Sequence, residues 1–213
     1  MTNSQDDYYK QTTQTVRTSY RLLHDYQRLI LDGCQYLGRE LNLVYEQGQS
    51  RFSDVVQRRN KDLKKWSWDW LPFYSYEMSF GKEVEDGRVH LSMVHIADTA
   101  GHATERSQRT DTQTMGSASQ SHSLIVFVYA LQAQGDSVPP RLDSLECHYP
   151  NDKEETYKTR QKFLDKCVLN AHKEKSFKQE GLCIMPVPVE EILSQEGADR
   201  VVARLKATFC ALG

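Results

Sequence analysis

Histidine and aspartate side chains gather in one short stretch of this 213-residue chain. His90, His95 and His102 lie within thirteen residues, and Asp98 lies among them. Such side chains hold transition metals when they converge at about 2 Å from the ion. His95, Asp98 and His102 could converge at the end of a strand. This pattern gives the hypothesis of an enzyme with a His-rich site at residues 90–102.

The same histidines also have a structural explanation, which we favour. The positions of His90 and His95 differ by an odd number, so their side chains would point to opposite faces of one strand. His90 would pair with Glu83 across a hairpin, and His95 would be half-buried beside Met78. We therefore expect no metal ligand in this stretch.

A second group of candidate residues combines cations with tryptophans between residues 51 and 70. Basic side chains beside exposed aromatic rings suit phosphates and stacked bases, or an anionic protein or lipid surface. Nucleic-acid binding is therefore an alternative function. The structural alternative is a solvated helix face whose tryptophans fill the core between helix and sheet. The candidate binding residues are Arg58, Arg59, Lys61, Lys64, Lys65, Trp66 and Trp68.

The sequence lacks the common motifs of nucleophilic and nucleotide chemistry. Serines surround His122, but they lie in a low-complexity stretch without a nucleophile elbow. No phosphate loop, dinucleotide fingerprint or HExxH motif occurs. Cys34 falls on an apolar helical pattern, which is typical of a packed thiol rather than a reactive one. We therefore expect no catalytic residue, no metal and no cofactor.

The element that must organise the chain is a long amphipathic helix from about Val16 to Val44. Its apolar residues alternate in steps of four and three, the pattern of a helix that packs along its length against another helix. We call this row of residues the seam. A second apolar stripe beside the seam widens the face, and Gly48 is expected to end the helix. The seam consists of Val16, Tyr20, Leu23, Gln27, Ile30, Cys34, Leu37, Leu41 and Val44, of which only Gln27 is polar.

This helix is long for a chain of this size. About 38 residues make a rod of roughly 57 Å, whereas a compact domain of this size has a diameter of roughly 45 Å. The rod must therefore bend, with Gly33 as the candidate position, or project and meet a partner. A second helix from Arg51 to about Trp66 would fold back on it as a helical hairpin.

Alternating apolar residues predict a β-hairpin at residues 74–93. Asp86-Gly87 is expected to form its two-residue turn, which would set Phe80 opposite Met93 and Met78 opposite His95. Asp98–Ser121 is polar and has almost no apolar residue, so it is expected to be a disordered or functional loop. Three further strands are expected. Residues 124–131 would be buried on both faces, residues 142–149 would lie at an edge, and residues 182–185 would be ended by Pro186 and Pro188. Helices are expected at residues 151–175 and 198–212.

The order of these elements predicts an α+β fold. A long N-terminal helix or helical hairpin would pack on a mostly antiparallel sheet of about four to five strands, with C-terminal helices. Residues 1–71 would form the helical arm and residues 72–213 the α+β domain, or the two parts would be one continuous domain.

The order helix, three antiparallel strands, helix, strand resembles the core of the PD-(D/E)XK nucleases. The resemblance implies Mg²⁺ held by an acidic residue that opens the second strand and by an acid-x-Lys motif on the third. Glu85 or Asp86 could stand for the first acid, but residues 124–131 contain neither an acid nor a lysine. The resemblance is one of topology alone, and it implies at most a nuclease-like core without its catalytic acids.

Composition sets the class of protein. Hydrophobic residues make up 38% and charged residues 26% of the chain, as in a soluble globular protein, and a net charge of -2 gives no global attraction to nucleic acid or an anionic membrane. The five cysteines are scattered, which predicts reduced thiols. The N-terminus is polar and no run of 18 apolar residues occurs, so neither a secretory signal nor a membrane span is expected. Together these features predict a cytoplasmic protein. We therefore expect a non-enzymatic interaction or assembly protein that uses the long helix to dock on a protein partner or to self-associate.

Overall fold

A computed structural model describes residues 3–50, 75–100, 121–134, 154–179 and 182–209 of the chain. It confirms the predicted α+β fold with a long N-terminal helix and C-terminal helices, and its sheet has six strands rather than four to five. The elements are α1 (Asn3–Glu40), β1 (Val44–Ser50), β2 (Ser75–Val84), β3 (Gly87–Ile96), β4 (Leu124–Ala133), α3 (Glu154–His172), β5 (Phe177–Gln179), β6 (Leu182–Pro188), the 3-10 helix η4 (Val189–Ile192) and α4 (Gln195–Thr208).

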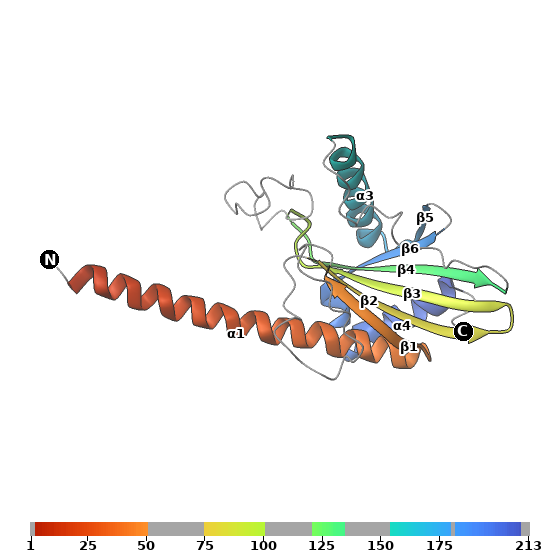
Figure 1. The fold of residues 1–213 in the computed structure, drawn as a ribbon, viewed down its shortest axis with the longest axis horizontal. Helices are drawn as coiled ribbons and strands as arrows, with labels where there is room; N and C mark the ends of the chain where they lie inside the picture. The colour runs from red at the N-terminus through yellow and green to blue at the C-terminus, as the bar shows by residue number, and fades with distance from the viewer. Residues whose placement is uncertain (1–2, 51–74, 101–120, 135–153, 180–181, 210–213) are drawn as a thin grey trace.

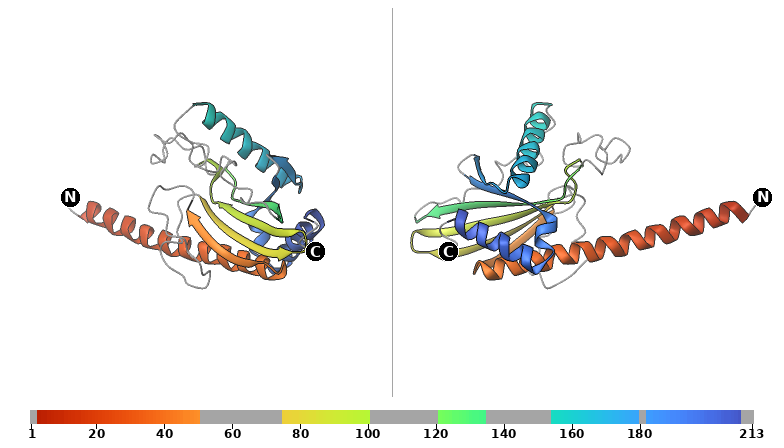
Figure 2. Two further views of the ribbon diagram at one scale, coloured as in Figure 1. Left: turned by 45° about the vertical axis from the view of Figure 1, so that its right-hand side comes forward. Right: turned by 180° about the vertical axis from the view of Figure 1, so that it is seen from behind.

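The six strands form one antiparallel sheet in the order β1-β2-β3-β4-β6-β5. The C-terminal part of α1 lies with α4 under one face of the sheet, and α3 lies over the other face (Figure 1). The two views of Figure 2 show the same layers, and in both of them the N-terminal part of α1 extends beyond the sheet.

Two hydrophobic cores lie on the two faces of the sheet, because side chains alternate between the faces along each strand. The core between the sheet, α1 and α4 includes Met78, Leu91 and Phe127, and the hydroxyl of Tyr36 on α1 donates to Asp199 on α4. The smaller core lies between the sheet and α3. It contains Val94, Ile96, Leu124, Val126, Val128, Ala130, Phe163, Leu164, Cys167, Ala171, Leu182 and Ile184.

The predicted end of the first helix at Gly48 is wrong. The helix ends at Glu40, and Asn42 follows with a φ of 53°, a left-handed conformation that asparagine tolerates. The amide of Leu43 then donates to the carbonyl of Gly38, which closes the helix end. Gly48 lies inside β1, where a Cβ would come 2.7 Å from the ring of Tyr76, so it serves close packing between strands.

The predicted hairpin exists, but its register differs from the prediction by two residues. Phe80 pairs with Leu91 rather than with Met93, and Met78 pairs with Met93 rather than with His95. The reason is that the turn residues are Glu85 and Asp86, and Gly87 already belongs to β3. A shift by an even number leaves every side chain on its predicted face.

The later elements follow the predictions with one correction. The strand predicted at residues 124–131 is confirmed as β4, and α4 carries the predicted inward residues Val201 and Leu205, with Phe209 directly after it. Pro186 does not end the strand before it, because it pairs with β4 inside β6, and the strand ends at Pro188. The predicted helix at residues 51–66, the loop core at residues 101–120, the edge strand at residues 142–149 and the domain boundary at residue 71 lie outside the described residues.

Candidate interaction surface on the N-terminal helix

The body of the protein covers the C-terminal half of the seam. Ile30, Cys34 and Leu37 are fully buried, and Leu41 just after the helix is 1% exposed. They belong to the core that lies under the sheet. This half of the seam therefore needs no external partner, since the protein's own sheet and α4 cover it.

The N-terminal half of the seam is exposed. Along α1, every described side chain from residue 7 to residue 23 is exposed, and residues 24–26 lead into the body. We call residues 7–25 the free half of α1. Val16 is 47% exposed, Tyr20 56% and Leu23 50%. The same 4-3 spacing therefore continues into solvent, and α1, which is one unbroken helix from Asn3 to Glu40, projects beyond the sheet (Figure 1).

Large apolar side chains are concentrated on this helix. Of the eleven exposed ones among the described residues, seven lie on α1. At 100° per residue they fall within an arc of roughly 180°, which makes one wide apolar face. They are Tyr8, Tyr9, Val16, Tyr20, Leu22, Leu23 and Leu29. Tyr9 extends the seam toward the N-terminus through Thr13, a continuation of the 4-3 spacing that could have been read from the sequence.

The sequence of the free half has a low intrinsic tendency to form a helix. Its centre is rich in threonine and serine, which have low helix propensity. Their hydroxyls donate to backbone carbonyls four residues earlier, as Thr15 does to Gln11 at 3.0 Å and Thr18 to Gln14 at 3.1 Å. Most of the stability of such a helix must come from packing of its apolar face.

The seam passes from solvent into the body at Gln27, its single polar residue. Gln27 is 2% exposed, and beside it the hydroxyl of Tyr26 lies 3.0 Å from Nε2 of His95 on β3. Burial lowers the pKa of His95 to about 4, so the imidazole is neutral near pH 7. Burial is also the main reason that the pKa of Tyr26 is raised; the Glu190 carboxylate raises it further, and a hydrogen bond with Ser123 lowers it. Both partners are neutral in the folded protein.

The family model named PM0109 matches residues 6–211 of the chain. The chain belongs to the PM0109 family. No curated protein and no solved structure matches it. The PM0109 match includes the free half of α1 together with the sheet and the C-terminal helices, so the projecting helix and the body form one family unit.

The structure describes only part of the predicted His-rich stretch of this PM0109 protein. His90 and His95 lie on opposite faces of β3, as expected, and His102 lies outside the described residues. His90 does not pair with Glu83; its Nε2 lies 2.9 Å from Oε1 of Gln132 on β4. His95 is fully buried rather than half-buried, because α1 covers it. Within the described ranges, no three histidine, cysteine or acidic side chains come together as a metal site.

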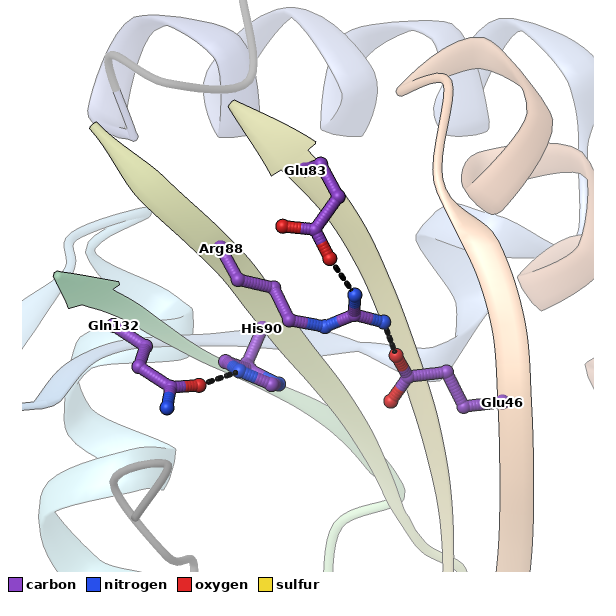
Figure 3. A network of polar contacts seen from close by, with 5 residues as sticks. All are labelled: Glu46, Glu83, Arg88, His90 and Gln132. Atoms are coloured by element: carbon purple, nitrogen blue, oxygen red, sulfur yellow. Dashed lines mark hydrogen bonds and ion pairs between the residues drawn. The ribbon is translucent and has the colours of Figure 1, made fainter. Parts of the chain in front are cut away.

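Arg88 explains why Glu83 is not available to His90. Its guanidinium donates to Glu83 on β2 and to Glu46 on β1, so one cation joins three strands (Figure 3). A β-bulge lies between Tyr45 and Gln47, at Glu46, and β1 is irregular there. Hydrogen bonding to Glu46 is the largest cause of the raised pKa of Arg88. This network stabilises the sheet edge and contains no group poised for chemistry.

A cavity of about 360 Å³ lies between the end of α3 and the start of β4. The rings of His122 and His172 meet edge to face there, with centroids 5.1 Å apart, and Glu190 also lines the cavity. Ser121 and Ser123 line the same cavity, so its wall contains hydroxyl, imidazole and carboxylate groups. The exposed seam carries far more surface than this cavity, so we take the free half of α1 as the candidate functional site of the PM0109 protein.

The predicted nucleic-acid segment cannot be placed in this site. Arg58, Arg59, Lys61, Lys64, Lys65, Trp66 and Trp68 all lie outside the described residues, so nucleic-acid binding stays a prediction. None of the helices that the structure describes is both long and apolar enough to cross a membrane.

Proposed function

We propose that this PM0109 protein is a non-enzymatic interaction or assembly protein that docks through the free half of α1. The observation that carries the proposal is the divided seam. Gln27 to Leu41 is covered by the protein's own body, and Val16 to Leu23 continues the same row in solvent. A contiguous apolar face of this size on a soluble protein marks an interaction site.

The exposed area supports a stable contact. The seven exposed side chains of α1 each leave roughly half of their surface in water. Covering them would remove roughly 700 Å² from solvent, near the ~800 Å² per partner of a standard interface. It would also supply the packing that a threonine-rich helix needs.

A reducing compartment fits this function. Cys34, Cys167 and Cys183 are free thiols, and an intracellular environment keeps thiols in that state. We therefore place the protein in the cytoplasm, where its helix would meet its partner.

Photo-crosslinking in cells tests the proposal. A photoreactive amino acid replaces Leu23 on the apolar face or, as the matched control, Gln14 on the opposite side of the same helix. We expect a discrete crosslinked product from position 23 and none from position 14. Mass spectrometry of the product then identifies the occupant, whether a second copy or another protein.

Two results contradict the proposal. If neither position yields a product, the free half meets no partner in the cell. If both positions yield the same products, the helix makes unspecific contacts and the apolar face has no docking role.

A further inference from the structure

We infer that the occupant of the free half of α1 is the free half of a second copy, packed antiparallel to the first. This inference rests on the proposed function and names its partner. Three features of the described residues support it: the position of the body on the helix, the match of seam residues, and the length of the free half.

The position of the body excludes a parallel pair. The sheet and α4 cover the seam from Gln27 to Leu41, which is the same row that Val16 and Leu23 continue. A parallel partner packed on the exposed seam would run directly into this covered part. An antiparallel partner runs the other way, so each body lies beyond the N-terminus of the other helix.

The seam positions pair with one another in that orientation, apart from Leu23, which lies opposite position 6. With the overlap centred between Gln14 and Thr15, Tyr9 of each copy lies opposite Tyr20 of the other, and Val16 lies opposite Thr13. Tyr9 and Tyr20 are both 56% exposed in the single chain. The contact would therefore pair aromatic rings at both ends and small or branched side chains near the centre.

The same register fits the length of the helix. Residue 25, where the free half ends, lies opposite residue 4, next to the first residue of α1. The overlap thus covers the whole free half of both copies and leaves neither body in contact with the other. Six of the seven exposed apolar side chains lie inside this overlap, and Leu29 lies beyond it, so each copy would bury roughly 600 Å², somewhat below the ~800 Å² of a standard interface.

Two cations beside the seam predict how the stability of the dimer depends on salt. Lys10 and Arg17 lie seven residues apart beside the seam, and both are exposed. In an antiparallel pair this side of one helix meets the same side of the other, so the cations of the two copies approach each other. The dimer should therefore tighten as salt screens this repulsion.

Sedimentation equilibrium of the purified full chain tests the inference over a wide range of protein concentration. We expect a monomer–dimer equilibrium that tightens with salt. Leu23→Glu should weaken the dimer more than about a hundredfold, because it buries a carboxylate in each copy. Gln14→Glu, the control, should change the dissociation constant by less than about threefold. Lys10→Glu should tighten the dimer by about threefold to tenfold, because it replaces repulsion with attraction to Arg17.

Disulfide trapping tests the orientation. A Tyr9→Cys chain is mixed with a Tyr20→Cys chain under mild oxidation, and the products are identified by mass. Antiparallel pairing predicts crosslinks between the two different chains. Crosslinks within each type, position 9 to position 9 and 20 to 20, would overturn the antiparallel arrangement.

A monomer at every concentration overturns the inference but leaves the proposed function standing if position 23 still crosslinks another protein in cells. Binding of the monomer to anionic lipid vesicles, lost in Leu23→Glu, would also overturn it and assign the face to a membrane surface. A dimer unaffected by Leu23→Glu would overturn the inference as well, because another surface would then hold the copies together.

Discussion

The hydroxyl of Tyr26 on α1 lies 3.0 Å from Nε2 of His95 on β3, at the point where the helix leaves the body. His95 is 1% exposed, and its other ring nitrogen has no hydrogen-bond partner within the described part of the chain. The hydroxyl of Tyr26 thus links the projecting helix to the sheet where its ring packs against the core.

This contact makes stability depend on pH. Burial lowers the pKa of His95 to about 4 from 6.5, so the unfolded chain binds more protons than the folded one between these values. The contribution of neutral His95 is fully present above pH 6.5 and is lost as the pH falls toward 4. We expect the free energy of unfolding to drop by about 2 kcal/mol between pH 7 and pH 5 from this group.

Urea unfolding at the two pH values measures this drop. Other groups also titrate in this range, so the same measurement on His95→Gln isolates the histidine. If the variant shows the same pH dependence as the parent chain, His95 is not the group responsible.

Removing the phenol hydroxyl should destabilise the junction. Tyr26→Phe keeps the ring and leaves Nε2 of the buried His95 without its partner, at a cost of about 1–3 kcal/mol. Chemical unfolding at pH 7 measures the loss. Tyr20→Phe is the control, because Tyr20 is exposed, and it should change the monomer's stability by less than about 0.5 kcal/mol.

The free half should be dispensable for folding. A chain without residues 1–22 keeps all of the buried seam, so its free energy of unfolding should change by less than about 0.5 kcal/mol at a concentration where both chains are monomers. A chain without residues 1–33 loses Ile30 and Leu31, which are buried in the core, and should not fold cooperatively. Thermal unfolding followed by circular dichroism distinguishes the two chains. Loss of the folded state in the shorter deletion would show that the free half supports the body.

The two carboxylates that bind Arg88 should contribute unequally. The side chain of Glu46 is 30% exposed and that of Glu83 73% exposed, and solvent weakens an ion pair. Glu46→Gln should therefore cost about 1 kcal/mol and loosen β1, whereas Glu83→Gln should cost less than about 0.5 kcal/mol. Urea unfolding gives both values, and hydrogen exchange at β1 shows where the loss occurs. Equal costs would argue against a role for the bulge at Glu46.

Gly87 should not tolerate a side chain. Its φ is 142°, and a Cβ would lie 1.9 Å from the carbonyl oxygen of Gln132 on β4. Gly87→Ala should therefore cost about 3 kcal/mol or more, because the backbone of β3 and β4 must separate. The nearby turn variant Glu85→Ala should cost less than about 0.5 kcal/mol. Thermal unfolding measures both, and a mild effect of Gly87→Ala would mean that the hairpin adjusts freely.

Cys34 should be unreactive in the folded protein. Burial raises the pKa of its thiol to about 12, so almost no thiolate forms at pH 8, whereas Cys183 is partly exposed. Alkylation at pH 8 followed by peptide mapping should label Cys183 and leave Cys34 unmodified until urea is added. Native labelling of Cys34 at the rate of Cys183 would show that the helix detaches from the sheet.

Much of this fold could be predicted from side-chain periodicity. The seam, the alternation along β2 and β3 and the buried run of β4 all follow from which faces must be covered, and the structure confirms these elements. The errors lie where local backbone chemistry decides. Asn42 ends the first helix in a left-handed conformation, and β1 follows where helix was expected.

The candidate site was predicted in part. Spacing identified Val16, Tyr20 and Leu23 as apolar positions, but no spacing rule states which part of a seam its own sheet will cover. That depends on β2, β3 and β4, which lie far along the chain and meet α1 only in the folded state. The pairing of Tyr26 with His95 joins residues 69 positions apart, and neither residue has a sequence motif that would reveal the other.

The helix α1 is continuous from Asn3 to Glu40, and its last turns are clamped in the core. Its inner end is therefore fixed in the body, whereas its outer half is a helix of low intrinsic propensity that a partner would stabilise. A partner bound to the outer end of α1 would therefore also set the orientation of the sheet relative to that partner. An assembly formed through this helix would hold its sheets at a fixed distance and orientation relative to one another.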